Sequence, residues 1–268
     1  MYDLMKPKKI GNIPDNPDGK FIYEIKYDGG SGVIEKYGDT VKIYHNKNPD
    51  NQSYKYPELV EGALRYLKDG VYVAEIVVFN KEGISDFSLF QKRQLENKVK
   101  IQFRRQLYPV VAMVYDVIRA NGEDITDYPL LERKKILSER VFDNSHIRLV
   151  EFFDRPEPIL KLKDKIEGIV IKDIDSAYKF GKRDGWFKYR FNKEETVKCV
   201  SYEVTPTGIV LITEDGRRIN LAGHRSEIAK KRIDEDGEVL VEISYHQKPK
   251  DGFRFPVVKR VVGELASP

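Results

Sequence analysis

The sequence of 268 residues predicts an α+β protein with two domains. A larger domain of antiparallel sheets and helices is expected over residues 1–191, and a small β-barrel over residues 192–268. Three observations support this. The N-terminal part mixes alternating apolar runs with stretches of helical spacing, and the part after residue 195 consists mainly of closely spaced short strands. The content of 40% apolar and 34% charged residues favours a folded chain over a disordered one.

The first domain is expected to begin with strands and continue with alternating helices and strands. Proline at the start and glycine just past the end mark the first helix, because proline fits the first turn and glycine ends a helix readily. Strands are predicted at 20–27, 32–36, 40–45, 71–79, 110–118, 168–171 and 185–191. Helices are predicted at 57–68 and 128–141.

The second domain shows five short strands with a helical segment after the third. Strands are predicted at 196–204, 208–213, 217–221, 238–245 and 256–262, and the helix at 224–232. This order is typical of a small OB-type barrel, which closes a short antiparallel sheet on itself.

Composition and the N-terminal sequence argue against several classes of protein. No apolar run is long enough to span a bilayer, and the N-terminus lacks the apolar core of a signal peptide. The single cysteine, Cys199, excludes an intrachain disulfide and a cysteine-rich zinc module. A cytoplasmic monomer that does not contact membranes is therefore expected. The net charge of +4 is compatible with a polyanionic partner.

One short segment, Lys26-Tyr27-Asp28-Gly29-Gly30, joins two apolar runs. It places Lys26 at a strand end beside a glycine-rich turn, where backbone can approach a phosphate closely. A lysine in that position can attack a nucleotide and hold it covalently. Taken alone, the segment is better explained as a hairpin turn with a surface lysine, because K-x-D-G occurs by chance in many proteins.

Charged residues in and around other predicted strands form an ordered series. Glu75 lies inside an apolar strand and needs a metal, a cation or a hydroxyl as partner. Glu167 and Lys172 flank one strand, and Lys188 and Arg190 share one face of another. Each has a plain structural explanation: an ion pair for Glu75, and solvated surface positions for the others.

The ordered set resembles the ATP-dependent polynucleotide ligases of the covalent nucleotidyltransferase superfamily, DNA ligases in particular. The resemblance extends from about residue 20 to residue 262. It is carried by the following segments: Lys26–Gly29, Phe87–Arg93, Tyr115-Asp116 with Pro129–Lys134, Glu167–Lys172, Trp186–Arg190 and Phe253–Pro256.

The resemblance implies an adenylation domain followed by an OB domain, and a reaction in three steps. Lys26 attacks the α-phosphate of ATP, the AMP passes to the 5′-phosphate of a nick in duplex DNA, and the 3′-hydroxyl seals the nick. Such an enzyme serves DNA replication, repair or recombination. Positioning and charge stabilisation dominate this chemistry.

The resemblance also assigns roles to individual residues. Catalysis is expected from Lys26, Asp28, Lys172 and Lys188. The nucleotide site is expected to add Glu24 at the adenine amino group, Tyr115 stacked on the ring, Glu75, and Arg254 at the pyrophosphate. A lysine must be neutral to attack, and neighbouring cations lower its usual pKa of ~10.4.

Metal and DNA contacts complete the expected site. Glu75 and Glu167 are hard oxygen ligands suited to Mg²⁺, with Mn²⁺ as a substitute. Contacts with nicked DNA are expected from His45, Asn46, Arg93 and Arg190. A basic stretch has two equally good interpretations, a solvated face or additional contacts with the DNA backbone. Its residues are Lys92, Arg93, Lys98, Lys100, Arg104 and Arg105.

The pattern departs from DNA ligases at three places. Ser31 and His45 stand where the family usually carries arginine, which leaves open how a nick is held. The last motif continues as Val261-Val262-Gly263-Glu264 instead of the usual basic-acidic string. Only 25 residues precede Lys26, too few for the additional domain of NAD-dependent ligases, which favours ATP as the cofactor.

Three alternatives remain open from the sequence. An RNA ligase fits Ser31 and His45, although the Phe87–Arg93 and Pro129–Lys134 segments favour DNA. An mRNA-capping guanylyltransferase shares the Lys26 motif and would use GTP. A non-catalytic nucleic-acid-binding OB protein would form no covalent nucleotide adduct.

Overall fold

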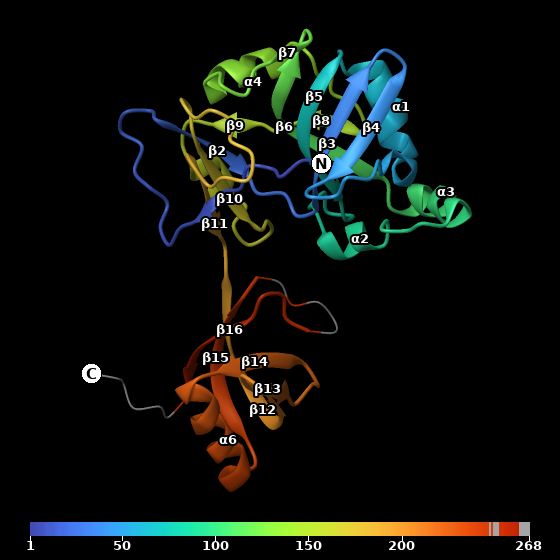
Figure 1. Cartoon of the computed structure of the whole chain (residues 1–268). Helices are drawn as coiled ribbons and strands as arrows, with labels where there is room; N and C mark the ends of the chain where they lie inside the picture. The colour runs from blue at the N-terminus through green and yellow to red at the C-terminus, as the bar shows by residue number, and fades with distance from the viewer. Residues whose placement is uncertain (247, 249–251, 263–268) are drawn as a thin grey trace. The chain divides into compact units, whose positions relative to one another are not determined.

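The structure is a computed structural model, and it describes residues 1–246, 248 and 252–262. The chain divides into two compact units, Met1–Tyr189 and Arg190–Pro268. Figure 1 shows the elements of each unit, which are described separately below. The expected division into functional domains at residues 191 and 192 stays a prediction.

The first unit contains a five-stranded sheet built around β10 (Gly168–Asp173), which pairs antiparallel with β2 (Phe21–Ile25). The order across this sheet is β1-β11-β10-β2-β9. The outer strands are β1 (Lys8–Lys9), β11 (Trp186–Arg190) and β9 (Phe152–Phe153). Strand β1 runs parallel to β11, so the N-terminal segment joins the edge of this sheet.

A second sheet of the first unit has the order β4-β3-β5-β6-β7, and β8 pairs with β6. Its central strands are β3 (Gly30–Tyr37), β5 (Gly70–Val78) and β6 (Val110–Ala120). The remaining strands are β4 (Thr40–His45), β7 (Glu123–Asp124) and β8 (Ile147–Leu149). Strands β5 and β6 are nearly continuous apolar runs, because side chains on both of their faces are buried.

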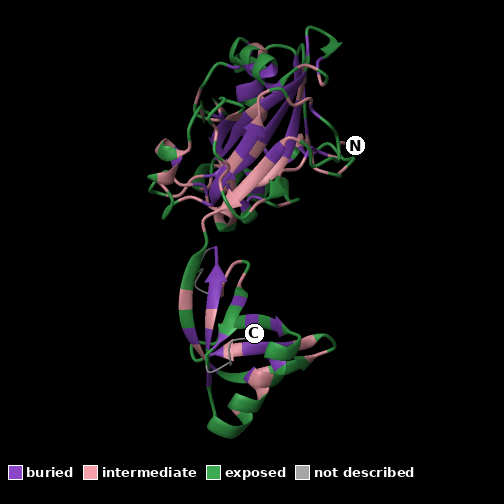
Figure 2. Ribbon diagram, turned by 90° about the vertical axis from the view of Figure 1, so that its left-hand side faces the viewer, coloured by how far each residue is buried: buried purple, intermediate pink, exposed green. Residues whose placement is uncertain are grey.

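Helices cover the second sheet and connect its strands. Helix α1 (Pro57–Tyr66) packs against the sheet through Leu59 and Ala63, and the main core of the unit lies between them. The other helical segments are η1 (Ser53–Lys55), α2 (Phe87–Gln91), α3 (Lys98–Leu107), α4 (Leu130–Ser138) and α5 (Glu157–Leu160). Buried residues follow the central strands (Figure 2).

The second unit is a curled antiparallel five-stranded sheet of half-barrel form, consistent with an OB fold. The strand order is β14-β13-β12-β15-β16, and helix α6 (His224–Asp236) connects β14 to β15. The strands are β12 (Lys193–Thr205), β13 (Gly208–Thr213), β14 (Arg218–Ala222), β15 (Val239–Tyr245) and β16 (Val257–Val261). The unit has a core of its own, which includes Leu211, Ile219 and Val241.

The predicted fold class is confirmed, and all predicted helices and strands occur, with ends shifted by a few residues. Helices α2 and α3 were missed, since α2 is only five residues long and α3 is strongly charged. The short elements η1, α5, β1, β7, β8 and β9 were also missed. Within the described ranges, no helix is long and apolar enough to cross a membrane. Gly263 and Glu264, where the last motif departs from the family pattern, lie outside the described residues.

Candidate active site

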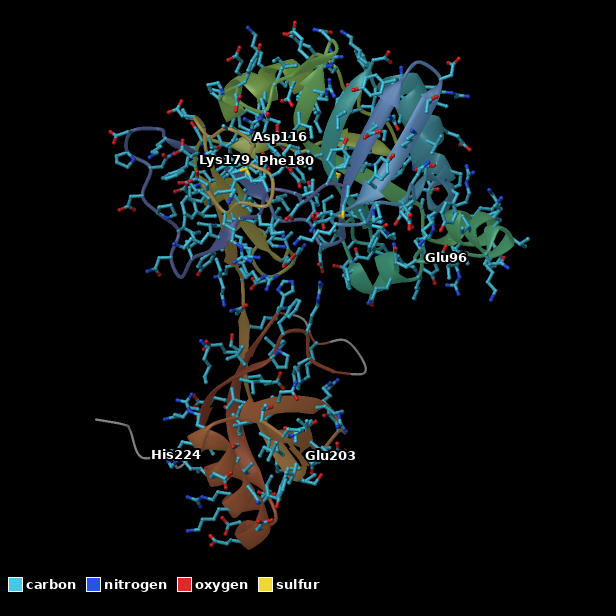
Figure 3. All side chains as sticks on the ribbon, viewed as in Figure 1. Glu96, Asp116, Lys179, Phe180, Glu203 and His224 are labelled. Atoms are coloured by element: carbon cyan, nitrogen blue, oxygen red, sulfur yellow. The ribbon has the colours of Figure 1, made fainter. Side chains whose placement is uncertain are left out.

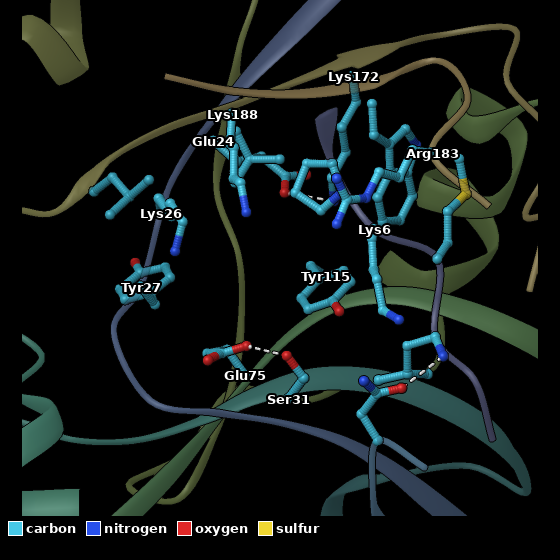
Figure 4. A pocket seen from close by; sticks show the side chains of 17 residues that line it. Lys6, Glu24, Lys26, Tyr27, Ser31, Glu75, Tyr115, Lys172, Arg183 and Lys188 are labelled. Atoms are coloured by element: carbon cyan, nitrogen blue, oxygen red, sulfur yellow. Dashed lines mark hydrogen bonds and ion pairs between the residues drawn. The ribbon is translucent and has the colours of Figure 1, made fainter. Parts of the chain in front are cut away.

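A cavity of about 300 Å³ lies in the first unit, lined by side chains from both of its sheets (Figure 4). Strands β2, β10 and β11 supply one wall, and β3, β5 and β6 supply another. The N-terminal residues 4–7 form part of the lining. Positively charged side chains dominate the charged groups of this lining: Lys6, Lys26, Lys172, Arg183 and Lys188, against the carboxylates of Glu24 and Glu75.

Lys26 directly follows the last residue of β2, at the expected strand end. Its backbone N–H donates to the carbonyl of Gly168 at 3.0 Å, which continues the pairing with β10. Its ammonium Nζ lies 2.6 Å from Oε2 of Glu167, whose side chain is almost fully buried. Lys26 and Glu167 therefore meet although 141 positions separate them in the sequence.

The glycines after Lys26 have a different role from the one expected. A Cβ at Gly29 would lie 2.1 Å from the carbonyl oxygen of Ile76, and a Cβ at Gly30 would lie 2.6 Å from the ring of Phe90. These positions are glycine because β3 begins in close contact with β5 and α2. The group that lies close to Gly29 is the backbone of Ile76. The packing of this turn therefore gives no support for phosphate binding at Gly29.

Glu75 is partly buried at the cavity wall. Strands β3 and β5 place Ser31 directly opposite Glu75, and the Ser31 hydroxyl donates to Glu75 Oε2 at 3.0 Å. Burial raises the pKa of Glu75 to about 7, although Lys26 and Ser31 lower it. Ser31, the residue that departs from the family pattern, thus orients a carboxylate beside the candidate nucleophile.

Glu24 lies at the base of the cavity between two lysines. Its Oε2 is 2.7 Å from Nζ of Lys172, and its Oε1 forms an ion pair with Lys134. Burial alone would raise the pKa of Glu24, but the two lysines hold it below its usual value. Glu24 was expected at the adenine amino group, a role that stays a prediction.

The ammonium of Lys172 also faces two aromatic rings. Its Nζ lies 4.4 Å from the centre of the Tyr115 ring and 4.2 Å from that of Trp186. Cation–π attraction of this kind stabilises a charge that has left water. Burial lowers the pKa of Lys172 to about 8, which leaves it close to titration at neutral pH.

The residue after Tyr115 holds helix α4 in place. Asp116, labelled in Figure 3, accepts two hydrogen bonds of 2.9 Å from Nε and Nη2 of Arg133. Both side chains are fully buried. The Tyr115-Asp116 and Pro129–Lys134 segments therefore form one packed structure, which presents Tyr115 to the cavity and Lys134 to Glu24.

His45 and Asn46 are held by contacts within the unit. Nδ1 of His45 lies 3.1 Å from the Ser31 carbonyl and must donate to it, so Nε2 accepts from the Tyr56 hydroxyl at 2.7 Å. Burial lowers the pKa of His45, which fits this neutral tautomer. The amide oxygen of Asn46 accepts from the Leu4 N–H at 2.9 Å and lines the cavity. Contacts of either residue with DNA stay predictions.

Direct contact of Arg93 with DNA is contradicted by its burial. The Arg93 side chain has 0% exposure and forms an ion pair with Glu58. It also donates to the carbonyls of Tyr108 and Lys55, at 2.8 and 2.9 Å. The arginine at the end of the Phe87–Arg93 segment thus anchors α2 to α1 and cannot reach a ligand in this arrangement.

The other predicted site residues lie in several places. Asp28 is buried, and its backbone N–H donates to the Ser85 hydroxyl at 3.0 Å. Lys188 lines the cavity from β11. Arg190 and Arg254 belong to the second unit, where both guanidinium groups lie over the ring of Phe255, at 4.8 and 5.2 Å.

Three cations near the site were not predicted. Lys6 and Arg183 line the cavity, and Lys134 pairs with Glu24. A signal for Lys134 existed, because Glu24 lies in an apolar strand and a buried carboxylate needs a cation. Lys6 and Arg183 carried no such signal, because they come from segments that only tertiary structure brings to the cavity.

The carboxylates fit a divalent metal by their chemistry. Glu167 is buried and lies 2.6 Å from Nζ of Lys26, whereas Glu75 is partly buried and its removal from water raises its pKa. Carboxylate oxygens are ligands that Mg²⁺ prefers, and a nearby cation would relieve the cost of burying Glu75.

Fold and cavity together define a class of protein: an α+β domain with a lysine-lined cavity between two mainly antiparallel sheets, joined to an OB-like unit. Residues 6–190 match the family described as "ATP dependent DNA ligase domain". The chain therefore belongs to the ATP-dependent DNA ligase domain family.

Individual relatives agree with this membership. The chain is 29% identical over 197 residues to a "Probable DNA ligase" of Dictyoglomus thermophilum, a match covering 68% of this chain and 34% of that protein. It is 29% identical over 181 residues to the "SPbeta prophage-derived DNA ligase-like protein LigB" of Bacillus subtilis, covering 64% and 61%. The match thus spans about a third of the length of the first relative.

Solved structures show the same fold. The chain superposes on a structure described as "DNA binding with a minimal scaffold: Structure-function analysis of Lig E DNA ligases" with a TM-score of 0.67 at 14% identity, covering 97% of this chain and 99% of that one. A "mycobacterial DNA ligase D complexed with ATP and MES" gives a TM-score of 0.57 at 16% identity, covering 95% and 94%.

Proposed function

We infer that the chain is an ATP-dependent DNA ligase that seals 5′-phosphate/3′-hydroxyl nicks in duplex DNA. The observation that carries this proposal is the position of Lys26, at the end of β2 in a cationic cavity, within a chain of the ATP-dependent DNA ligase domain family. The functional division is proposed to be an adenylation domain of residues 1–191 and an OB domain of residues 192–268, acting as a cytoplasmic monomer.

The nucleotide is proposed to be ATP. A cavity of about 300 Å³ lined by several cations suits a triphosphate, and one solved relative of the same fold is described as a complex with ATP. Tyr115 offers a ring for stacking on the base, beside Glu24 and Lys172. Arg254 of the OB domain is proposed to contact the leaving pyrophosphate.

The first step forms a covalent lysyl-AMP adduct. Nζ of Lys26 attacks the α-phosphorus, a P–N bond forms, and the P–O bond to pyrophosphate breaks. The ammonium must first lose a proton, and Glu167 Oε2 at 2.6 Å is positioned to accept it. Lys188 and Lys172 stabilise the negative charge that develops on the phosphate oxygens.

Magnesium is proposed as the metal, with Mn²⁺ as a substitute. Glu75 and Glu167 would hold it, with Ser31 orienting Glu75 through the 3.0 Å hydrogen bond. When bound, the metal supplies positive charge that offsets the charge of the phosphates.

In the later steps AMP moves to the 5′-phosphate at the nick, and the 3′-hydroxyl displaces it. Nicked duplex DNA is the proposed partner, in keeping with the family. His45, Asn46 and Arg190 are the proposed DNA-contacting residues, whereas Arg93 supports the fold. Such an activity would serve replication, repair or recombination.

One experiment tests cofactor, nucleophile and substrate together. The protein is incubated with Mg²⁺ and ATP or GTP labelled at the α-phosphate, and the adduct is then offered nicked DNA or nicked RNA duplexes. We expect a labelled adduct with ATP, its loss in Lys26→Ala, and sealing of nicked DNA. Lys42→Ala is the matched control, since Lys42 is an exposed lysine of β4.

Each other outcome identifies an alternative. Labelling by GTP would indicate a capping-type guanylyltransferase, and sealing of nicked RNA alone would indicate an RNA ligase. A normal yield of adduct in Lys26→Ala would exclude Lys26 as the nucleophile. The absence of any adduct in the unmodified protein would leave a nucleic-acid-binding protein.

A further inference from the structure

The carboxylate of Glu24 lies between one lysine that faces the cavity and one that does not. Glu24 and Lys172 both line the cavity. Lys134 reaches Glu24 from helix α4, and its side chain is 3% exposed. Lys172 therefore pairs with the Glu24 carboxylate on the cavity side, and Lys134 pairs with it on the side away from the cavity.

The cluster of Glu24, Lys134 and Lys172 carries more positive than negative charge. Two ammonium groups share one carboxylate, since Asp116 nearby is engaged by Arg133 through both of its oxygens. Aromatic faces support the excess charge: Tyr115 and Trp186 next to Lys172, and Phe152 at 5.6 Å from Lys134. A buried cluster with one cation in excess is favourable for an anionic ligand.

We propose that Lys134 is a positioning residue for nucleotide binding: it acts as the permanent counterion of Glu24, so that Lys172 can turn from Glu24 toward the bound nucleotide. This inference rests on the proposed function, and it goes beyond that function because Lys134 is not among the residues that line the cavity. Lys172 is the mobile member of the cluster because it alone of the two lysines lines the cavity.

The position of Lys134 is fixed by its neighbours in α4. Arg133 anchors the helix to β6 through Asp116, and also donates to the carbonyls of Tyr128 and Ser176, at 2.5 and 2.9 Å. Glu24 is fixed on the other side, because β2 pairs with β10 and β9. Lys134 can therefore hold Glu24 in place while Lys172 moves.

Without Lys134, Lys172 would be the sole counterion of Glu24. Its release toward a ligand would then leave a buried carboxylate without a cation, which is strongly unfavourable. Replacing Lys134 by methionine should thus weaken nucleotide binding. It should not unfold the protein, because Glu24 and Lys172 remain as a neutral pair and methionine keeps most of the side-chain volume.

The test measures adduct formation in single-turnover experiments with Mg²⁺ and varied ATP. We expect Lys134→Met to raise the apparent KM for ATP at least about tenfold, with the rate at saturating ATP within about threefold of the unmodified protein. Lys134→Arg should restore KM to within about threefold, since arginine keeps the charge. Lys135→Met is the matched control, because Lys135 is the exposed neighbour on the same helix.

A pH profile separates positioning from a merely structural role. Burial is the main cause that lowers the pKa of Lys172, and repulsion from Lys134 lowers it further. Attraction to Glu24 opposes both effects by raising this pKa. If charged Lys172 contacts the nucleotide, KM for ATP rises with pH above about 8 in the unmodified protein. In Lys134→Met this rise should move to higher pH.

Several results would overturn the proposal. An unchanged KM in folded Lys134→Met would show that Lys134 is not needed to position the cluster. If that variant does not fold, Lys134→Gln carries the same test, and failure of both to fold would make Lys134 a structural residue only. Absence of any adduct in the unmodified protein would instead reject the proposed function, so the two failures are distinguishable.

Discussion

At the scale of single residues, Gly29 shows how a motif position can be set by packing. Its absent side chain allows β3 to approach the backbone of Ile76, where a Cβ would lie at 2.1 Å. The neighbouring contact of Gly30 with Phe90 has the same character. The sequence of this segment suggests a phosphate-binding turn. In the structure, its glycines let β3 pack closely against its neighbours, which places Ser31 opposite Glu75.

Gly29→Ala should destabilise the protein by about 2–3 kcal/mol, because the added methyl group displaces the backbone of β5. Urea unfolding followed by circular dichroism measures the loss. Gly11→Ala is the control, since nothing lies within 4 Å of a Cβ built at Gly11. Equal stability of the two variants would contradict this account of the motif glycine.

His45 makes stability depend on pH. Burial, followed by repulsion from Lys55, lowers its folded pKa below the usual 6.5, so the unfolded state binds the proton more readily. Stability should therefore fall as pH drops below about 6.5, by at most about 1.4 kcal/mol per pH unit for one proton.

Denaturant midpoints between pH 5 and pH 8 test this prediction. His45→Gln removes the titrating group and should flatten the acid side of the curve, while leaving other titrating residues in place. A midpoint that falls equally steeply in both proteins would assign the acid sensitivity to other groups.

At the scale of elements, the pairing of Asp116 with Arg133 joins β6 to α4. Both side chains are fully buried, and removing one partner leaves a buried charge unpaired. Arg133→Met should cost about 3–5 kcal/mol in unfolding free energy. The exposed control Lys135→Met should stay within about 0.5 kcal/mol of the unmodified protein.

The same pair offers a double-mutant cycle. Asp116→Asn combined with Arg133→Met should be destabilised by less than the sum of the two single variants, since neither charge is then left alone. Additive losses would show that the two side chains stabilise the fold independently.

At the scale of the whole molecule, the two units have separate cores. Leu59 belongs to the core of the first unit and Leu211 to that of the second, and both are fully buried. Leu59→Ala should destabilise the first unit and Leu211→Ala the second, each by about 2–5 kcal/mol.

Hydrogen exchange of backbone amides, assigned to each unit, distinguishes the two effects. Each substitution should accelerate exchange mainly within its own unit, because the methyl groups that it removes contact only that core. Equal acceleration in both units would show that they unfold as one cooperative body.

Much of this architecture could be predicted because its signals are local. Alternation of apolar residues predicted β2, β3 and β4, and helical spacing with Pro57 predicted α1. Helix α3 could not be found in this way: of its ten residues, Ile101 is the buried one, and its remaining apolar side chains are exposed. Its caps, such as Asn97, depend on geometry that composition does not reveal.

The predicted site residues differ in the same way, since some had a local signal in the sequence and others had none. Glu75 was found from sequence because a charge inside an apolar strand needs a partner, whereas Lys26, Glu167 and Lys172 were assigned through the resemblance of the ordered motifs. Arg93 was misjudged, since an arginine in a charged stretch gives no local sign that it is buried against Glu58. Lys134 was overlooked as a partner of Glu24, although a carboxylate inside an apolar strand indicates that a cation lies near it.

The sequence by itself determined the fold class, the order of the strands along the chain and the lysine at the end of β2, because these follow from local periodicity and turn chemistry. Only the tertiary structure decided which charges meet. Sheet register brings together Lys26 with Glu167, Glu24 with Lys172, and Ser31 with Glu75, while the packing of α4 brings Lys134 to Glu24. Register depends on packing between segments distant in sequence, and packing decides which of many lysines and carboxylates leave water together.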